Sequence, residues 1–286
     1  MSPSAFISNT LVIGILEAAP LVLAAIGFTL IFRLNGFTNI AYAENITLGA
    51  YFAVIFNSVL GLNFYVSIIP AALLSGIVGA LTYLVVFRPA IRFGVGKTEL
   101  IILSVGLSYF LRYGARLVFG NDLYNFDFGG SSFFKVLGIG VTNVQLISVL
   151  LVIVICIALY FFIYRTNYGQ MMRALADNED LAKVSGINPA KVSVLMWFLS
   201  GISAGLAGAF YGTFSFVSSS LGWNMILIII MVSIVGQVGS VSGALITSIA
   251  LGIITSAVTL LSQPMYGQIV LLLLFIVFLK LKKVRV

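Results

Sequence analysis

The residues best suited to chemistry lie in one hydrophilic segment, Arg165–Lys191, which reads RTNYGQMMRALADNEDLAKVSGINPAK. This 165–191 loop holds three of the eight acidic residues of the chain, Asp177, Glu179 and Asp180, together with four basic ones. Such a mixture favours charged contacts with a partner in water over a covalent reaction, since it pairs no nucleophile with a base. We therefore expect a docking element; the alternative is a solvated connector whose charges only keep it in water.

Patterns typical of catalytic and metal sites are missing from the sequence. The chain has no histidine, and its single cysteine, Cys156, can form neither an internal disulfide nor a thiolate cluster. Gly96-Lys97-Thr98 resembles the end of a phosphate-binding loop, but that motif requires glycine at position 91, where this chain has Ile91. We therefore predict no enzyme activity and no cofactor or metal, and we expect any ATP hydrolysis on another subunit.

The elements that must position the 165–191 loop are apolar. Hydrophobic residues make up 61% of the chain and charged residues 8%, against about 25% charged in soluble proteins. Crossing the roughly 30 Å hydrocarbon core of a bilayer takes about 20 apolar residues per helix. The sequence therefore predicts an all-α, polytopic integral membrane protein with a single transmembrane domain at 1–286. Its apolar segments are 11–32, 38–57, 64–87, 99–118, 144–164, 192–212, 222–240, 243–262 and 266–280.

Two stretches interrupt these apolar segments. The second segment opens with TNIAYAENIT, and the run GQVGSVSG at 236–243 is rich in glycine. Irregular backbone survives at membrane depth only where protein or a water-filled cavity satisfies its hydrogen bonds. We therefore expect broken or re-entrant helices at both places, and eight or nine transmembrane helices in total.

The basic residues indicate the orientation of the chain. Twelve of the fifteen fall at one set of segment ends, including the 165–191 loop, and only Arg112, Arg116 and Lys135 fall on the other side. Because cytoplasmic loops carry the excess of Lys and Arg, we place the C-terminus in the cytoplasm and the N-terminus outside. The net charge of +7 does not indicate nucleic-acid binding, since these residues lie between apolar segments rather than along a polar face.

A few charged residues lie inside the apolar segments, Glu44 foremost among them. An unpaired carboxylate at membrane depth is costly, so Glu44 is a functional candidate. The alternative is a structural carboxylate tied to Arg33 or to a broken helix end. Glu17 and Arg112 present the same choice, and a buried ion pair between two helices is a third alternative.

Helix signals divide the 165–191 loop. We predict short helices over about Tyr168–Ala176 and Glu179–Ser185, the second capped by Asp177 or Asn178. Gly186 can end this second helix by adopting a left-handed conformation. The Asn-Pro pair at 188–189 predicts the start of the next span. That span carries a ridge of small residues predicted to pack tightly within the chain: Gly201, Ala204, Gly205, Ala207, Gly208, Ala209 and Gly212.

The loop sequence RALADNEDLAKVSGI resembles the cytoplasmic coupling loop of the LivH-like permeases of branched-chain amino acid ABC importers, whose pattern is R-A-x-A-x-N-P-E-x-A-x-x-x-G-I. Glu179 stands where that family usually has proline, and Tyr42-Ala43 where it has His-Gly. Further matching blocks occur in the same order along almost the whole chain. They are GFTLIFRLNGFTNIAYAENITLGAY, Arg88-Pro89 with Arg92, Gly106-Leu107-Ser108 with Phe119-Gly120, and Gly236/Gly239/Ser240/Gly243.

The resemblance implies a type II ABC importer-like permease in the plasma membrane, carrying branched-chain or related amino acids. It also implies a second permease subunit, identical or different, two cytoplasmic ATPases and an extracellular solute-binding protein. The residues it assigns to ATPase coupling are Arg173, Ala174, Ala176, Asp177, Asn178, Glu179, Ala182 and Gly186. Those expected along the translocation path are Asn39, Tyr42, Glu44 and Asn45.

The alternative is a secondary transporter or channel that works without an ATPase. Such proteins place ionisable residues and broken helices at a site near the membrane centre, which the second segment and Glu44 would suit. The partner-like 165–191 loop argues against it.

Overall fold

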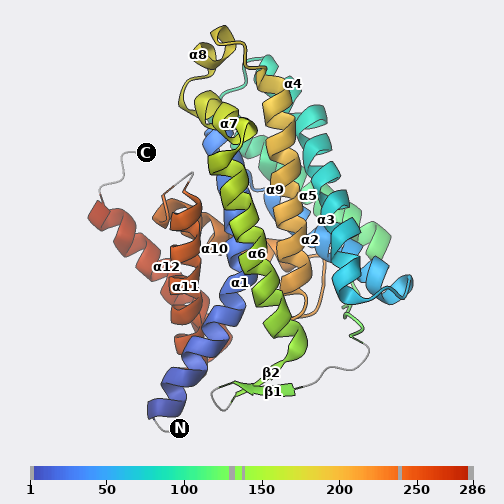
Figure 1. Cartoon of the computed structure of the whole chain (residues 1–286), viewed down its shortest axis with the longest axis vertical. Helices are drawn as coiled ribbons and strands as arrows, with labels where there is room; N and C mark the ends of the chain where they lie inside the picture. Colours follow the sequence, from blue (N-terminus) through green and yellow to red (C-terminus); the bar gives the residue numbers. More distant parts are fainter. Residues whose placement is uncertain (1–2, 129–132, 137–138, 238–239, 283–286) are drawn as a thin grey trace.

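The computed structural model describes residues 3–128, 133–136, 139–237 and 240–282 as a helical bundle with one small β-hairpin (Figure 1). Its helices are α1 (Pro3–Asn35), α2 (Tyr42–Val54), α3 (Phe64–Thr82), α4 (Arg88–Arg92), α5 (Lys97–Phe119), α6 (Asn143–Arg165), α7 (Asn167–Asp177), α8 (Glu179–Val184), α9 (Pro189–Tyr211), α10 (Leu221–Val235), α11 (Val241–Leu261) and α12 (Pro264–Lys282). The π-helical turns Ile55–Val59 and Tyr83–Phe87 extend α2 and α3. Strands β1 (Phe133–Val136) and β2 (Ile139–Thr142) pair antiparallel, with Phe133 opposite Thr142.

Each predicted apolar segment is mainly helical, which confirms an all-α membrane protein. Within the described residues, six helices are long and apolar enough to cross a membrane: Phe6–Asn35, Phe64–Arg92, Lys97–Phe119, Asn143–Arg165, Pro189–Tyr211 and Val241–Leu261. The α10 helix and the Tyr266–Leu281 part of α12 are apolar but shorter. The expected number of eight or nine spans therefore stays a prediction.

The two interruptions take the form of turns between helices. After α1 the chain turns at Gly36, whose φ is +69°, and α2 begins at Tyr42. The polar residues Glu44 and Asn45 therefore lie in the first turn of a helix rather than in a break. At the second interruption α10 ends before Gly236, and the Ser240 hydroxyl accepts a hydrogen bond from the Gly243 amide at 3.0 Å to begin α11; residues 238–239 lie outside the described part.

Helix α9 is the buried centre of the bundle. Its small residues allow neighbouring helices to pack closely against it. It packs against α1, α2 and α3. A Cβ added at Gly201 would lie 2.5 Å from the Ser75 carbonyl oxygen, and one at Gly205 would lie 2.6 Å from the Ser75 Cβ. Larger side chains would force these backbones apart, so the ridge is the tight packing seam within the chain that its sequence predicts.

Two serines and one aromatic ring fix α9 in place. The Ser200 hydroxyl donates to the Gly27 carbonyl at 2.7 Å, and the Ser203 hydroxyl donates to the Leu23 carbonyl at 2.9 Å, both on α1. The Trp197 ring is fully buried with its centroid 4.9 Å from that of Phe87. The core therefore joins the N-terminal helix to the helix that follows the 165–191 loop.

The 165–191 loop folds as its helix signals predict. Asn178, rather than Asp177, caps α8, because its side-chain oxygen accepts from the Leu181 amide at 3.0 Å. Gly186 follows with φ +84°, the left-handed turn that glycine favours. Asn188 caps α9 by accepting from the Lys191 amide at 3.2 Å. The loop thus contains two short helices, α7 and α8, at the end of the bundle opposite the N-terminus (Figure 1).

Candidate functional site

Helix α7 is anchored to the membrane core by its own buried side chains. Met172 and Leu175 are buried. The Arg173 guanidinium donates to the Ile163 carbonyl near the end of α6 and lies 5.5 Å from the centre of the Tyr164 ring. Arg173 therefore braces the corner between α6 and α7, in addition to any part it has in coupling.

Four large apolar side chains are exposed on the otherwise hydrophilic 165–191 loop. Val184 is 88% exposed and Leu181 66% exposed on α8. On α7, Tyr168 and Met171 are exposed as well, one helical turn apart. A connector that is merely solvated has no reason to hold such side chains in water, whereas grouped exposed apolar residues mark a partner site.

The proposed coupling residues divide between this surface and the packing beneath it. Ala174 and the stretch 177–179 are exposed, as is Gly186, whereas Ala182 is buried and Arg173 and Ala176 are half-buried. Sequence reasoning missed Tyr168 and Met171, although their three-residue spacing places them on one face of a helix. The coupling role of the whole set stays a prediction.

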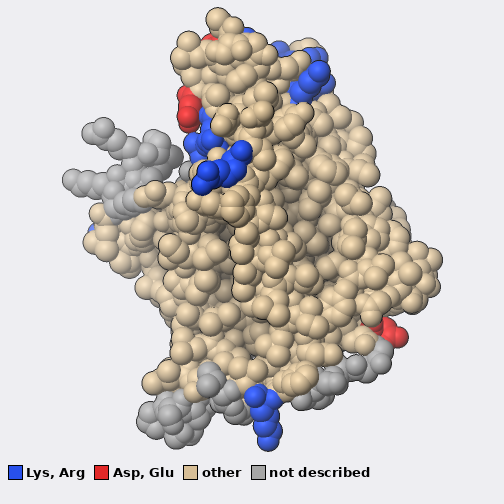
Figure 2. Space-filling model, viewed as in Figure 1, with Lys and Arg blue, Asp and Glu red and all other residues tan. Residues whose placement is uncertain are grey.

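The acidic residues of the loop each lie within 4 Å of a basic side chain, on α1 or on α8 itself. Asp177 contacts Arg33 at the end of α1, with 3.4 Å between carboxylate oxygen and guanidinium nitrogen. Lys183 lies 2.8 Å from Glu179 and 3.6 Å from Asp180. The hydrogen bond that Lys183 donates to the Glu179 carboxylate is the main cause that raises the pKa of Lys183. Figure 2 shows Lys and Arg gathered around this end of the molecule, above a broad surface without charge.

Glu44 lies in a buried polar cluster between α2, α5 and α10. Its Oε1 accepts from the Ser108 hydroxyl at 2.7 Å and from Arg112 Nη2 at 2.7 Å. The Arg112 guanidinium carbon lies 3.9 Å from the centre of the Trp223 ring, close enough for a cation–π contact. Of the alternatives for Glu44, the structure supports the ion pair between two helices, because Arg33 pairs with Asp177 instead.

The other residues predicted along the translocation path lie near Glu44 inside the chain. Asn39, Tyr42 and Asn45 are each at most 2% exposed, and the Tyr42 hydroxyl donates to the Ala24 carbonyl at 2.9 Å. All four residues contact protein in this conformation. Their part in translocation stays a prediction.

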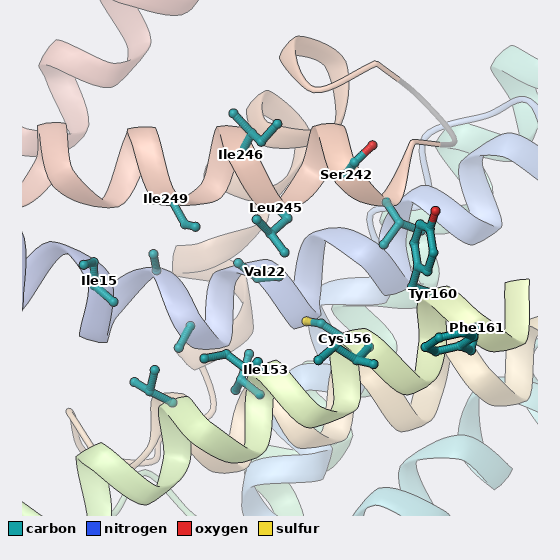
Figure 3. A pocket seen from close by; sticks show the side chains of 16 residues that line it. Ile15, Val22, Ile153, Cys156, Tyr160, Phe161, Ser242, Leu245, Ile246 and Ile249 are labelled. Carbon is teal, nitrogen blue, oxygen red and sulfur yellow. The ribbon is translucent and has the colours of Figure 1, made fainter. Parts of the chain in front are cut away.

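Two cavities flank α1. One of about 520 Å³ lies between α1, α6 and α11, where apolar side chains such as Val22, Cys156 and Leu245 point toward one another (Figure 3). The other, of about 270 Å³, is polar and is lined on α1 by Glu17. Glu17 has no site assigned to it from the sequence alone. The described residues contain no group of three or more His, Cys, Asp or Glu that could hold a metal ion.

Comparison with known proteins gives the family. A model described as "Branched-chain amino acid transport system / permease component" matches residues 10–279. The probable branched-chain amino acid transport permease protein LivH of Methanocaldococcus jannaschii is 30% identical over 254 residues, 86% of this chain and 79% of that protein. The high-affinity LivH of Escherichia coli is 26% identical over 257 residues, 84% of this chain and 82% of that protein.

The ribose import permease protein RbsC of Escherichia coli is also similar, at 23% identity over 282 residues, which cover 94% of this chain and 84% of that protein. The match to the family model spans nearly the whole chain and includes the central α9, the Glu44 cluster and the 165–191 loop. The chain therefore belongs to the permease component family of branched-chain amino acid transport systems, and it is a multi-pass membrane transport subunit rather than an enzyme.

Proposed function

We propose that this chain is the membrane subunit of an ATP-driven importer that carries branched-chain amino acids across the plasma membrane. The relatives named LivH support that substrate class, and the ribose permease provides the competing substrate to test. The importer would contain a second permease subunit, identical or different, two cytoplasmic ATPases and an extracellular solute-binding protein.

The observation that carries the proposal is the exposed apolar surface of the 165–191 loop. Val184 and Leu181 project from α8 at the end of the bundle where basic residues gather. A groove on an ATPase would bury these side chains, with Ala174 and the stretch 177–179 at the contact. Gly186 sets the turn that presents α8, because its φ of +84° suits glycine best.

Helix α7 provides a mechanical link from such a partner to the membrane core. It contacts α1, α6 and α9, and Arg173 and Asp177 tie it to α6 and α1. Movement of the ATPases on binding ATP would therefore shift these helices as rigid bodies and open a central path alternately to each side. In this arrangement the 165–191 loop lies in the cytoplasm and the N-terminus lies outside.

The test compares an apolar-to-acidic change on the loop with the same change at the other end. Val184→Asp should abolish retention of the ATPase on the purified permease, because a charge enters an apolar groove. Gly186→Val should weaken retention by straining the turn. The matched control is Val59→Asp, since Val59 is also highly exposed, at 73%, but lies far from the loop; it should retain the ATPase.

Uptake in reconstituted vesicles completes the test. Leucine uptake should require ATP and the ATPase, and ribose uptake should be absent. Normal ATPase retention and uptake by both Val184→Asp and Gly186→Val would show that the loop is a solvated connector. Leucine uptake by the permease without any ATPase would favour a secondary transporter or channel.

A further inference from the structure

Glu17 is an acidic side chain that opens to the outside of the chain at membrane depth. It lies within the span Phe6–Asn35, and its side chain is exposed. The other membrane acid, Glu44, is buried and bonded to Arg112 and Ser108. Glu17 makes neither a hydrogen bond nor an ion pair with any residue that the structure describes. Because an unpaired carboxylate against lipid is costly, this face of α1 calls for water or a polar partner.

The surroundings of Glu17 form a polar cavity of about 270 Å³. Six further polar residues line it, contributed by α10, α11, α12, the end of α9 and the turn that follows α9: Tyr211, Ser215, Asn224, Thr255, Thr259 and Gln268. Among the described residues that line it, none is Lys or Arg. The cavity therefore combines one carboxylate with several neutral groups that can accept hydrogen bonds, a set that suits an ammonium group with its three donors.

The position of the cavity fits a site for a passing solute. Tyr211 ends α9, Asn224 lies in the first turn of α10, and Gln268 lies in the first turns of α12. These helix ends lie toward the end of the bundle opposite α7 and α8 (Figure 1). The cavity on the other side of α1 is lined mainly by apolar side chains (Figure 3). The Glu17 cavity therefore differs from it in having many more polar side chains in its lining.

We propose that the Glu17 cavity is a water-filled part of the translocation path, in which the Glu17 carboxylate receives the ammonium group of an amino acid. The substrate class rests on the proposed function. The charge of Glu17 then makes this stretch selective for solutes with a positive group, and Asn224 and Thr259 offer oxygen atoms to the remaining ammonium protons.

The first experiment measures water access and local charge with the permease in its reconstituted complex. Cys156 is the single native cysteine and is buried, so a Cys156→Ser, Thr255→Cys protein presents one thiol in the cavity. Water-soluble cationic and anionic thiosulfonates should both modify it, the cationic one faster. Glu17→Gln should lower the cationic-to-anionic rate ratio by on the order of tenfold.

The matched control is Glu99→Gln, which removes an exposed carboxylate from the first turn of α5, outside the cavity. It should leave the rate ratio unchanged. A thiol at position 255 that reacts with neither reagent would overturn the proposal, because the cavity would then face lipid. An unchanged ratio in Glu17→Gln would overturn it too, because the carboxylate would not act on the cavity.

The second experiment tests the ligand. Leucine should slow modification of the thiol at position 255, and its 2-oxo acid analogue, which lacks the ammonium group, should not. Glu17→Gln should weaken protection by leucine about tenfold, equivalent to about 1.4 kcal/mol. If leucine protects the thiol equally well with and without Glu17, in a complex that takes up leucine, the proposed role of Glu17 is refuted. The proposed function would then still stand. Absence of leucine uptake by the unmodified complex would refute the proposed function and the substrate assignment with it.

Discussion

Replacement of Arg112 by methionine should be among the most destabilising changes in the membrane core. Arg112 is 8% exposed, and its guanidinium donates through both Nε and Nη2 to the Glu44 carboxylate, at 3.2 and 2.7 Å. Methionine fills much of the same volume but leaves the Glu44 carboxyl, which is 1% exposed, without its arginine partner and hydrogen-bonded to Ser108. Breaking a buried pair in this way costs about 3–5 kcal/mol, and loss of the contact with Trp223 adds up to about 2 kcal/mol.

A second change in the same protein should recover most of that loss. In Glu44→Gln, Arg112→Met, the glutamine oxygen can still accept from Ser108, and no buried charge remains. Replacing both members of a buried pair is often close to neutral, so the interaction energy from a double-mutant cycle should exceed about 2 kcal/mol. Glu44→Gln alone should cost less than Arg112→Met, because Arg112 retains an acceptor and the Trp223 ring.

Equilibrium unfolding of the purified permease in mixed micelles measures these free energies. Arg116→Met is the matched control, since Arg116 lies one turn further along α5 and has no carboxylate partner among the contacts described: it donates to the Ser219 hydroxyl at 3.2 Å and lies 5.5 Å from the centre of the Tyr113 ring. Its loss should cost about 1 kcal/mol, within the range for a single hydrogen bond. If Arg112→Met lowers the free energy of unfolding no more than Arg116→Met does, the pair of Glu44 and Arg112 is hydrated or contributes little to stability. That result would refute the reasoning.

Two further predictions concern orientation and packing. Single cysteines in a Cys156→Ser background should react with impermeant reagents from the cytoplasm at Asn178 and from outside at Asn125, both of which are exposed; labelling of both from one face would contradict the topology. Gly205→Leu should destabilise by at least about 1–3 kcal/mol, because even a Cβ there lies 2.6 Å from the Ser75 Cβ. Gly106→Leu on α5 is its control, since a Cβ at Gly106 meets nothing within 4 Å, and equal unfolding free energies would rule out the seam.

The parts of this structure that follow from local chemistry could be predicted from the sequence. Asn178 and Asn188 cap helices because a side-chain oxygen satisfies an amide two or three residues away, and Gly186 turns because it lacks a Cβ. The lengths of the apolar segments fix the class of fold in the same way. None of these features depends on where distant parts of the chain lie.

The start of α2 shows what local reasoning leaves out. Its polar sequence indicates an interruption, and residues 36–41 between α1 and α2 are indeed non-helical. The sequence does not indicate the distant group that satisfies the backbone there: the Ile40 amide donates to the Ser104 hydroxyl of α5 at 3.0 Å. Likewise, no pattern described from the sequence indicates the β-hairpin of β1 and β2. In both cases a pairing partner, which no local pattern specifies, decides the structure.

Glu44 and Glu17 are the same residue type in similar apolar surroundings, and the sequence alone places only Glu44 on the expected translocation path. The partner of Glu44 is 68 residues away on another helix, whereas Arg33, nearer in sequence, pairs with Asp177 across 144 residues. Packing therefore assigns one acid to the core and leaves the other at the wall of a polar cavity. The Glu44 carboxylate is already paired with Arg112, so it attracts a positively charged substrate only weakly. Glu17, which has no hydrogen bond or ion pair with a described residue, is therefore the stronger candidate for contact with the solute.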